Sequence, residues 1–561
     1  MTYLTETASD LKGICNLFAK FFQSVYVDSS QVTGNASISS NNTDLHSLDI
    51  SYDELLQELG LLNENFNPGF DGIPSAFLKN TASAIAYPLN MLFDLSLSQG
   101  VFPSLWKKTF IIPLHKGGSK SDILNYRPIC KISAIPKLFE KIVYNKLILH
   151  FNNLVSPKQH GFCRGRSTAS NLAIFTNYIY ECFSGGFQCD TIFTDFSKAF
   201  DRINHCILID KLKILGMGSN LLDWMISYLS GRTQYVKIDS VISDDIMVTS
   251  GVPQGSHLGP LLFLIFINDI PDLIKYSECL MFADDIKLFK MIRTRSDCID
   301  LQSDFQQLYY WCIANDLPLN ISKCTFLSFS RTVPSKFHYY YNTGGSILSE
   351  VVVKKGLGVI FDRKLCFLKH IDFIINKARS MLGFVLRNSK EFSDLLTLKL
   401  LYFAYVRSIL EYCCIIWDPF YINQSSRIER IQRKFTRNAI ARLRWNINFP
   451  SYWTRCSLLG IMSLVNRRKF FAVMFVRDII HHHLYCPYLL AKIKVYCPSR
   501  ALRPRNIFFY MPFSATNYSP NEPLTRCLRH ANSMFGYLEF ELWEFRNNFK
   551  RKLLLSLSIV Q

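Results

Sequence analysis

The chain has 561 residues with 49% apolar and 19% charged side chains, and its formal net charge is +19. This composition excludes a disordered chain, because the apolar surface suffices to offset the entropy of ordering, and the length allows roughly three to four domain-sized units. A positive surplus of this size favours a polyanionic partner, although a generic basic surface is an alternative. The 17 cysteines include no C-x-x-C pair, so neither a zinc ribbon nor a zinc knuckle is predicted.

No segment predicts a membrane span. The two longest apolar stretches are 395–417 and 260–274. The first is interrupted by charged residues, and the second is too short to cross a bilayer. The N-terminus has acidic residues where a signal peptide needs basic and apolar ones. We therefore expect an intracellular protein whose polyanionic partner is nucleic acid rather than lipid.

Periodicity and composition divide the chain into four regions. Residues 1–67 open with a helical pattern and continue into a polar linker. Residues 68–365 alternate short apolar strands with helical stretches, which is typical of an α+β fold. Residues 366–445 are predicted to be helical, and residues 446–561 form a mixed, basic C-terminal region rich in aromatic residues and Pro.

The first candidate site is the segment TIFTDFSKAFD, residues 191–201. Thr191 to Thr194 predict a strand with Asp195 at its end, where a carboxylate can bind a hard cation such as Mg²⁺. An Asp in this place more often caps a following helix. This motif by itself leaves both interpretations open.

Two further motifs follow along the chain. SGVPQGSHLGP, residues 250–260, predicts a glycine loop that leads into a helix at about Pro260 and lets backbone approach a nucleotide closely. CLMFADDIKLFK, residues 279–290, predicts two apolar strands joined by a tight turn that holds Asp284 and Asp285. Aspartates are ordinary in turns, but two adjacent acids between apolar strands favour a compensating cation.

The three motifs together predict more than each one alone. One acid from a strand and two from a hairpin can converge on a pair of metal ions, which stabilise the attacking and leaving oxygens of an in-line displacement. Nucleotidyl transfer has this requirement.

These segments resemble motifs A, B and C of reverse transcriptases, and further motifs occur in the family's order. The other segments that carry the resemblance are PGFDGIP (68–74), WKKTFIIPLHKGGSKSDILNYRPI (106–129), QHGFCRGRST (159–168), WCIANDLPLNISKC (311–324), GLGVIFDRKLCFLKHI (356–371) and LLYFAYVRSILEYCCIIWDPF (400–420). The last one is similar to the thumb of Jockey-like non-LTR retrotransposon enzymes. The resemblance runs from about residue 68 to 445.

The resemblance implies a right-hand polymerase, with fingers and palm in residues 68–365, a helical thumb in 366–445 and a C-terminal region of unknown role. The implied reaction is RNA-directed DNA synthesis, in which deoxynucleotides are added to a primer 3′-hydroxyl. Two Mg²⁺ ions are the implied cofactors, with Mn²⁺ as a substitute. The implied partners are an RNA template, a DNA primer and dNTPs, without a membrane.

The resemblance also implies roles for individual residues. These are Asp195, Asp284, Asp285 and the main-chain carbonyl of Phe196 as metal ligands, Lys116 and Arg127 at the triphosphate, Gln254 and Gly255 at the incoming nucleotide and template base, Phe200 as a gate against a ribose 2′-hydroxyl, Lys323 as proton donor to pyrophosphate, and Arg164 and Arg166 as cations that grip the template. For the two lysines, a solvated surface position is the alternative. One position departs from the family, because the hairpin has Phe282 where the family most often has Tyr.

Residues 427–445 predict an amphipathic helix with one basic face. Its cations recur at helical spacing: Arg427, Arg430, Lys434 and Arg437. Beside a thumb-like segment, we interpret this face as tracking the phosphates of a template–primer duplex, with a solvated face as the alternative.

Three other functions fit parts of the pattern. A viral-type RNA-dependent RNA polymerase carries a second Asp five residues after the first, where this chain has Phe200. A group II intron maturase would need a maturation or nuclease module after the thumb, and we recognise none. A non-catalytic RNA-binding scaffold would not need all three aspartates.

Complete elements of this type usually encode an endonuclease ahead of the polymerase. Here residues 1–67 precede the first motif, so we expect an endonuclease to come from elsewhere or from a missing N-terminal part. The expected location is the nucleus or a cytoplasmic ribonucleoprotein.

The basic helix generates a testable prediction. Replacing Arg430, Lys434 and Arg437 by Ala should weaken binding of an RNA–DNA duplex and flatten its salt dependence. Each lost phosphate contact should reduce the slope of log affinity against log salt by up to about 0.7–0.9, because fewer counterions are released. A salt titration measures this slope, and an unchanged slope would identify the face as merely solvated.

Overall fold

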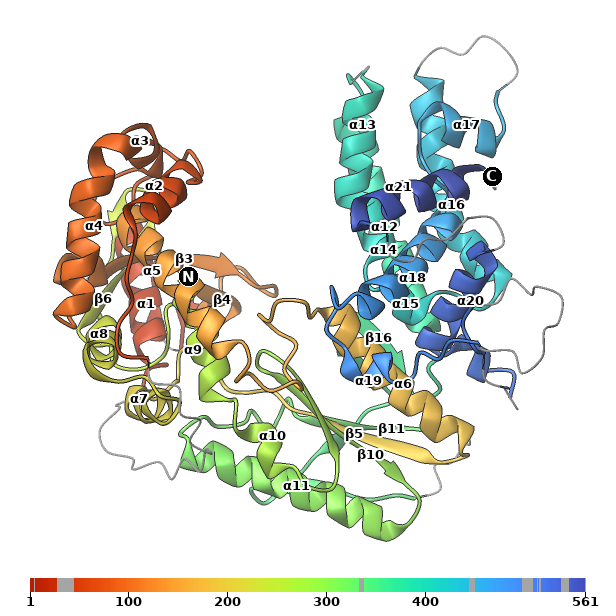
Figure 1. Ribbon diagram of the computed structural model, residues 1–561, viewed down its shortest axis with the longest axis horizontal. Coiled ribbons are helices and arrows are strands. Elements are labelled where there is room, and N and C mark those ends of the chain that lie inside the picture. Colours follow the sequence, from red (N-terminus) through yellow and green to blue (C-terminus); the bar gives the residue numbers. More distant parts are fainter. Residues whose placement is uncertain are drawn as a thin grey trace.

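The computed structural model describes the chain except for residues 5, 28–44, 332–336, 393, 443–448, 497–507, 512, 514–515, 536–543 and 560–561. Two lobes stand on a central sheet, so the ribbon has the outline of a U in Figure 1. The N-terminal lobe combines a small sheet with helices, and the C-terminal lobe consists mainly of helices. The chain therefore has a mixed α+β fold.

The N-terminal lobe contains a five-stranded sheet in the order β4-β3-β6-β7, with β8 paired to β6. β3 runs antiparallel to β4 and parallel to β6. The strands are β3 Lys108–His115, β4 Tyr126–Lys131, β6 Arg232–Ile238, β7 Val241–Ile242 and β8 Ile246–Val248.

Helix α1, Leu11–Gln23, lies against this small sheet, as its apolar spacing predicts. Asp10 caps the helix by accepting a hydrogen bond from the Gly13 amide at 2.8 Å. The apolar stripe of α1, which includes Phe18, packs against Ile111 and Val236. The residues before 68 that the structure describes thus pack on the same lobe as the strands that follow.

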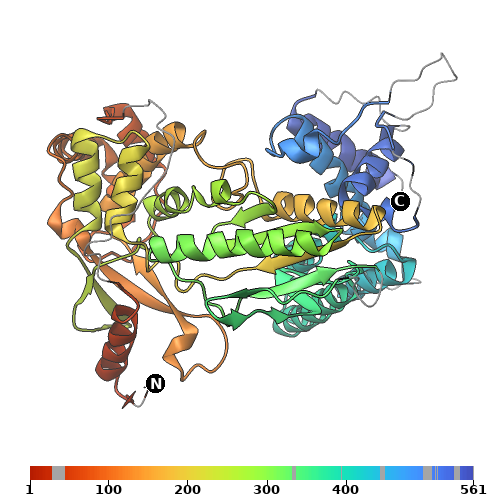
Figure 2. The same cartoon turned by 90° about the horizontal axis from the view of Figure 1, so that it is seen from below.

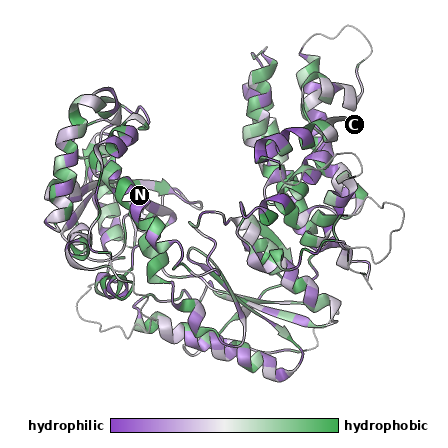
Figure 3. Ribbon diagram, in the orientation of Figure 1, coloured by the Kyte–Doolittle hydropathy of each residue, from purple (hydrophilic) through white to green (hydrophobic). Residues whose placement is uncertain are grey.

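The helices of the N-terminal lobe surround a core of large aromatic side chains. The rings of Phe93 and Phe139 stack at 4.2 Å, and Trp224 meets Phe139 edge-on at 5.3 Å. The helices are α2 Tyr52–Gly60, α3 Ser75–Asn80, α4 Ala82–Ser98, α5 Ala134–Phe151, α7 His205–Ile214, α8 Ser219–Leu229, α9 Leu258–Phe266 and α10 Ile270–Leu273. In Figure 3, α9 is hydrophobic on the side in view, and nearly all of its residues are buried, which anchors the glycine loop before it.

The central sheet has the strand order β14-β11-β5-β10-β9. Its strands are β5 Gln188–Phe193, β9 Glu278–Phe282, β10 Asp285–Ile292, β11 Thr325–Phe329 and β14 Ser349–Glu350. β5 pairs antiparallel with both β10 and β11. Every residue of β5 is buried, so this strand is the middle of the molecule.

Both faces of the central sheet are covered, because alternate side chains of a strand point to opposite faces. Phe193 and Phe289 join one hydrophobic core with α6, Thr168–Ser184, and the C-terminal lobe. Ile192 and Leu288 join the other core with α11, Arg295–Ala314, and the N-terminal lobe. Figure 2 shows α6 and α11 running along the sheet.

The C-terminal lobe begins with a hairpin of β15, Val353–Gly356, and β16, Val359–Asp362, and continues as helices. These are α12 Leu368–Asn388, α13 Leu395–Tyr402, a π-helical turn Phe403–Arg407, α14 Ser408–Glu411, α15 Cys414–Trp417, α16 Ile422–Ala441, α17 Tyr452–Leu458, α18 Leu464–Ile480, α19 Pro487–Leu490, α20 Pro523–Phe535 and α21 Arg546–Ile559. The part of residues 446–561 that the structure describes is therefore largely helical, whereas the sequence predicted a mixed region. Helix packing buries many of the aromatic rings of this region.

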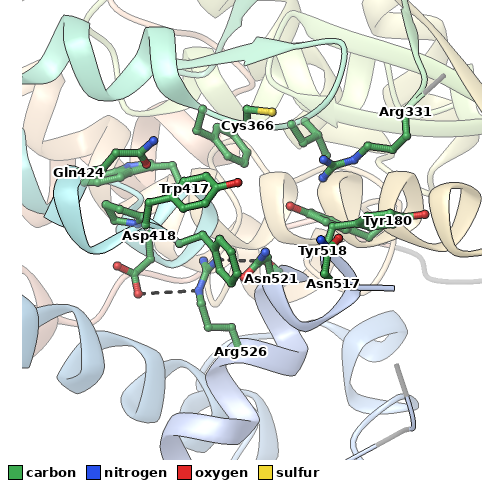
Figure 4. A pocket seen from close by; sticks show the side chains of 15 residues that line it. Tyr180, Arg331, Cys366, Trp417, Asp418, Gln424, Asn517, Tyr518, Asn521 and Arg526 are labelled. Atoms are coloured by element: carbon green, nitrogen blue, oxygen red, sulfur yellow. Dashed lines mark hydrogen bonds and ion pairs between the residues drawn. The ribbon is translucent and has the colours of Figure 1, made fainter. Parts of the chain in front are cut away.

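Asp418, just after α15, ties the last helices to the rest of the lobe. Its Oδ1 lies 2.6 Å from Arg468 Nε of α18, and its Oδ2 lies 3.8 Å from Arg526 Nε of α20. Figure 4 shows the pocket of about 100 Å³ beside this contact, where Trp417 and Tyr180 come from distant parts of the chain. Because Arg468 is almost fully buried, the pair joins these helices only while both charges are present.

The remaining elements are short. They are β1 Thr2–Tyr3, β2 Glu6–Thr7, β12 Asn342–Thr343, β13 Ser346–Ile347 and the 3₁₀ turns Ser104–Lys107, Ile123–Asn125 and Ser519–Asn521. Among the helices in the described part of the chain, none has the length and apolar character needed to cross a membrane.

Candidate active site

Asp195 and Asp285 lie opposite each other at one end of the central sheet. β5 pairs with β10 so that Phe193 faces Lys287, and the Thr194 amide donates to the Ile286 carbonyl at 3.1 Å. Continuing this register by two residues places Asp195 across from Asp285. Asp195 caps no helix here, because the next helix begins at His205 and is capped by Asn204.

Asp284 occupies a two-residue turn between β9 and β10, as the sequence predicted. Ala283, the first turn residue, has a φ of +52°, a conformation that is unfavourable for a side chain with a Cβ. Such strain persists only where neighbouring groups hold the backbone, and it concentrates at functional sites.

Gln159 stabilises this strained turn by accepting hydrogen bonds from main-chain amides. Its Oε1 accepts hydrogen bonds from the Ala283 and Gly161 amides, both at 2.8 Å, and the side chain is only 2% exposed. Gly161 fits because a Cβ there would lie 2.3 Å from the Ala283 nitrogen. Sequence reasoning singled out the segment QHGFCRGRST, 159–168, for its arginines and missed this contact of Gln159.

Lys287 is a buried cation on β10, two residues after Asp285. Its Nζ donates to Asn171 Oδ1 at 2.6 Å, and Asn171 Nδ2 donates in turn to the Met281 carbonyl of β9. Burial lowers the pKa of Lys287 to about 8, while the charge of Asp285 acts in the opposite direction. In the sequence, this residue is marked only as a Lys in an apolar strand.

The negative charges of the aspartates are incompletely compensated. Burial, and then the charge of Asp195, raise the pKa of Asp284. Lys323 Nζ lies 3.3 Å from Asp195 Oδ2, and a cavity of about 360 Å³ beside Asp195 and Asp285 is also lined by Lys354.

This donor set suits a hard divalent cation, because carboxylate oxygens that repel each other are stabilised by the charge between them. In the described part of the chain, no three or more Asp, Glu, His or Cys side chains are already gathered closely enough to hold a metal ion.

The N-terminal lobe brings cations to the same place. Lys116 follows β3, and Arg127 belongs to the paired strand β4. Partial burial and then the charge of Arg127 lower the pKa of Lys116, whereas Asp195 and Asp284 act to raise it. Lys116 and Arg127 thus stand beside the aspartates, although they come from the other lobe.

Lys198 joins this group of cations and was not predicted. Partial burial lowers its pKa, and the charges of Lys116 and Lys323 lower it further. Its Nζ also lies 4.9 Å from the centre of the Phe21 ring of α1. The only sequence signal was its position three residues after Asp195.

The glycine loop is bound to the turn after Asp195 and to β4. Gln254 Nε2 donates to Asp201 Oδ1 at 2.7 Å, and its carbonyl accepts from the Cys130 amide at 2.8 Å. Burial raises the pKa of Asp201 to about 6. Gly255 has a φ of +125°, and a Cβ there would lie 2.7 Å from the Cys130 carbonyl, so the close approach requires glycine.

Phe200 is half-buried at the edge of the N-terminal core. Its ring stacks on Phe263 of α9 at 4.4 Å, and its carbonyl accepts from the Val252 amide at 2.8 Å. Phe196, also predicted, is buried, and its backbone forms an isolated bridge with Leu319.

The predicted template cations differ in their surroundings. Arg164 is exposed. Arg166 Nη1 instead donates to main-chain carbonyls, including that of Ser156 at 2.7 Å, and its guanidinium lies 5.1 Å from the Tyr485 ring centre. Arg166 thus also fixes its own loop and contacts the C-terminal region.

The basic helix is α16, which lies in the C-terminal lobe, away from β5 and β10 of the central sheet in Figure 1. Arg427 is paired with Asp372 at 2.6 Å, whereas Arg430, Lys434 and Arg437 are exposed. The predicted helix extended to 445, but α16 ends at Ala441, and residues 443–445 lie outside the described part of the chain.

Comparison with known proteins agrees with this geometry. Residues 115–384 match the family described as "Reverse transcriptase (RNA-dependent DNA polymerase)". The matched segment contains the central sheet with Asp195, Asp284 and Asp285, and reverse transcriptase domains depend in general on divalent metal ions.

Three relatives narrow the assignment. The chain is 28% identical to "Probable RNA-directed DNA polymerase from transposon X-element" of Drosophila melanogaster, over 72% of this chain and 46% of the relative. It is 28% identical to the transposon BS polymerase of Drosophila melanogaster over 69% and 44%, and to that of mobile element jockey of Drosophila funebris over 59% and 37%. The chain is thus similar to RNA-directed DNA polymerases of transposons and mobile elements, jockey among them. It spans less than half the length of these curated relatives.

The contact of Gln159 with the turn generates a stability prediction. Gln159→Met should lower the free energy of unfolding by about 1–3 kcal/mol, because the buried Ala283 and Gly161 amides would lose their acceptor. Urea unfolding followed by fluorescence measures the change. The matched control is Gln307→Met at an exposed position of α11, which should stay within about 0.5 kcal/mol of wild type. Equal stability of the two variants would show that this contact contributes nothing.

Proposed function

We propose that this chain is an RNA-directed DNA polymerase that adds deoxynucleotides to a primer 3′-hydroxyl and copies retrotransposon RNA. The observation that carries the proposal is the meeting of Asp195 and Asp284 with Lys116 and Arg127 of the opposite lobe. Acids on one side and cations on the other suit a triphosphate with its metal ions. The RNA template, DNA primer and dNTPs are the proposed ligands.

On this proposal, Asp195 and Asp284 bind both Mg²⁺ ions, Asp285 supports them, and the Phe196 carbonyl is a further ligand. Bound there, the ions would supply charge stabilisation at the reacting phosphate and a primer hydroxyl of lowered pKa. Lys287 supports the site from beneath by partly neutralising Asp285. Gln159 and the register of β5 with β10 fix the spacing of the carboxylates before substrate binds.

The cations around the aspartates have distinct roles in the proposal. Lys116 and Arg127 bind the triphosphate oxygens, for which a planar guanidinium is well shaped, and Lys198 adds a third charge. Lys323 stays paired with Asp195 until nucleotide arrives and then protonates the pyrophosphate leaving group. Gln254 orients the glycine loop through its hydrogen bond to Asp201, and Gly255 lets the backbone approach the template base.

The architecture proposed for this reaction is a right hand. The N-terminal lobe serves as the fingers, the central sheet with α6 and α11 as the palm, and α12 to α16 as the thumb. The exposed basic residues of α16 would contact the duplex, and Arg164 the template. Residues after 446 would extend the thumb side of the molecule.

The metal assignment is tested by Asp284→Asn. Loss of one ligand charge should reduce primer extension on an RNA template by at least about a hundredfold, because metal ions contribute several kcal/mol of charge stabilisation. Duplex binding should stay within about twofold. The matched control is Asp272→Asn at an exposed position of α10, which should extend like wild type. Wild-type extension by Asp284→Asn would refute the two-metal site.

The sugar gate is tested by Phe200→Val. A ribose 2′-hydroxyl at this ring would lose water without gaining a partner, which costs roughly 1–3 kcal/mol and corresponds to about 5–150-fold discrimination. Removing the ring should reduce the preference for deoxynucleotides by that factor. The measurement is the ratio of deoxy- to ribonucleotide incorporation, alongside a melting curve.

Phe200 also contributes to the core through Phe263, so a stability loss is expected in addition. The control is Phe263→Leu, which should lower stability but leave the sugar preference unchanged. An unaltered ratio in a folded Phe200→Val variant would remove this ring from the site.

A further inference from the structure

A second cavity lies in the C-terminal lobe, far from the aspartates. Its volume is about 730 Å³, within the range of ligand pockets. Its lining includes Lys399, Phe403, Arg407, Trp453 and Arg467. Figure 1 places α13 and α17, which supply part of this lining, at the end of the lobe remote from the central sheet.

The lining of this cavity includes an arginine that lies against an aromatic ring. The Arg407 guanidinium carbon lies 3.3 Å from the centre of the Phe403 ring. Both residues belong to the π-helical turn Phe403–Arg407, and single π turns inside helices occur frequently at functional sites. Trp453, also in the lining, is 46% exposed. Planar groups of both kinds are available for a flat ligand to stack on.

The cavity carries excess positive charge. Arg467 forms a two-point contact with Glu411, at 2.7 and 2.8 Å, and Arg407 Nε lies 3.5 Å from the same carboxylate. One acid is thus shared by two arginines. Lys399 adds a third cation, whose Nζ donates to the Leu459 carbonyl. An anionic ligand would compensate these charges.

A strip of alternating arginine and aromatic side chains leads from α16 to the cavity. Arg433 lies 4.9 Å from the Tyr452 ring centre, and Arg437 lies 5.7 Å from that of Phe449. Tyr452 adjoins Trp453, with ring centres 5.0 Å apart. Tyr452 itself is buried, so the half-exposed rings of Phe449 and Trp453 are the ones that offer stacking surfaces. Stacking surfaces interleaved with cations are the features by which proteins bind unpaired nucleic acid.

We propose that this cavity and strip bind an unpaired nucleic-acid strand, with a base stacked at Trp453 and Arg407 and phosphates beside Lys399 and Arg467. The proposal rests on the proposed function only for the origin of the strand, which is either the RNA template outside the copied region or a single strand of DNA. Both share stacked bases and a phosphate backbone. The site holds the strand outside the catalytic carboxylates.

The test is binding of a fluorescein-labelled 20-nucleotide RNA, and separately of the same sequence in DNA, followed by anisotropy without divalent metal. Trp453→Ala should weaken binding roughly 5- to 150-fold, because one stacked base is lost. Its salt slope should equal that of wild type, since no charge is removed. Trp453→Phe should restore most of the affinity. The probe that suffers the larger loss identifies the strand.

The control is Tyr310→Ala, another half-exposed aromatic, on α11 beneath the central sheet. It should bind both probes like wild type. Wild-type affinity of Trp453→Ala for both probes, or an equal loss in Tyr310→Ala, would overturn the proposal.

Extension of a primer annealed to a template with a three-nucleotide overhang separates this proposal from the polymerase assignment. Trp453→Ala should extend it within about twofold of wild type. If wild type fails to extend but Trp453→Ala still loses binding, the polymerase assignment fails and the strand site stands. If extension and binding fall together on this short substrate, Trp453 acts on the catalytic core and the strand site is refuted.

Discussion

The antiparallel pairing of β5 with β10 is the constraint on which the rest of the molecule depends. Its register sets Asp195 across from Asp285, and a slip by one residue would turn each aspartate toward the opposite face. The pair cannot slip cheaply, because Phe193 and Phe289 belong to one core while Ile192 and Leu288 belong to the other. Two hydrophobic cores thus fix the position of a polar site that contributes little stability of its own.

Several charged side chains lie close together at the end of this sheet, next to the two hydrophobic cores. The aspartates lie above a buried lysine, and cations from the other lobe stand beside them. Such an arrangement costs desolvation energy unless each charge finds a partner. Lys287 is held by Asn171, and Asp195 by Lys323, so the site is pre-organised without being neutral. Because the acids and cations of the site are not all paired with one another, they remain able to bind ligands that carry both metal cations and phosphates.

The net charge of +19 is distributed between two different uses. Some arginines join helices, as Arg468 does with Asp418. Others, such as Arg430 and Lys434, lie exposed on α16. The net charge counts paired, buried cations together with exposed ones, because a sequence does not show which cations are buried. A fully buried cation paired with an acid, such as Arg468, contributes little to binding a polyanion, so the net charge overstates the available surface.

Sequence patterns predicted the elements that carry the aspartates because local chemistry determines them. A buried strand ending in Asp195 and a hairpin with Asp284 in its turn need only apolar periodicity and turn-forming residues. The helical character of 366–445 followed in the same way from the 3.6-residue period. The C-terminal helices were harder to predict, because their apolar faces include buried arginines such as Arg468 and Arg477.

Several site residues carried no sequence signal because their roles depend on distant partners. Gln159 acts on a turn 124 residues away, and Lys354 reaches the aspartates through a hairpin that follows β14. Arg166 is predicted to grip the template, and the fold gives it further contacts with the carbonyl of Ser156 and the Tyr485 ring. No periodicity records which main-chain groups a side chain will meet.

The sequence by itself thus determined the aspartates, their order and the local elements that present them, since strand, turn and glycine preferences act over a few residues. The tertiary structure alone decided that Lys116 and Arg127 stand beside these aspartates, that Gln159 holds the turn, and that an arginine-rich cavity opens in the C-terminal lobe. These features arise from contacts between residues far apart in the chain. Their geometry is set by the packing of whole lobes, which short-range preferences do not specify.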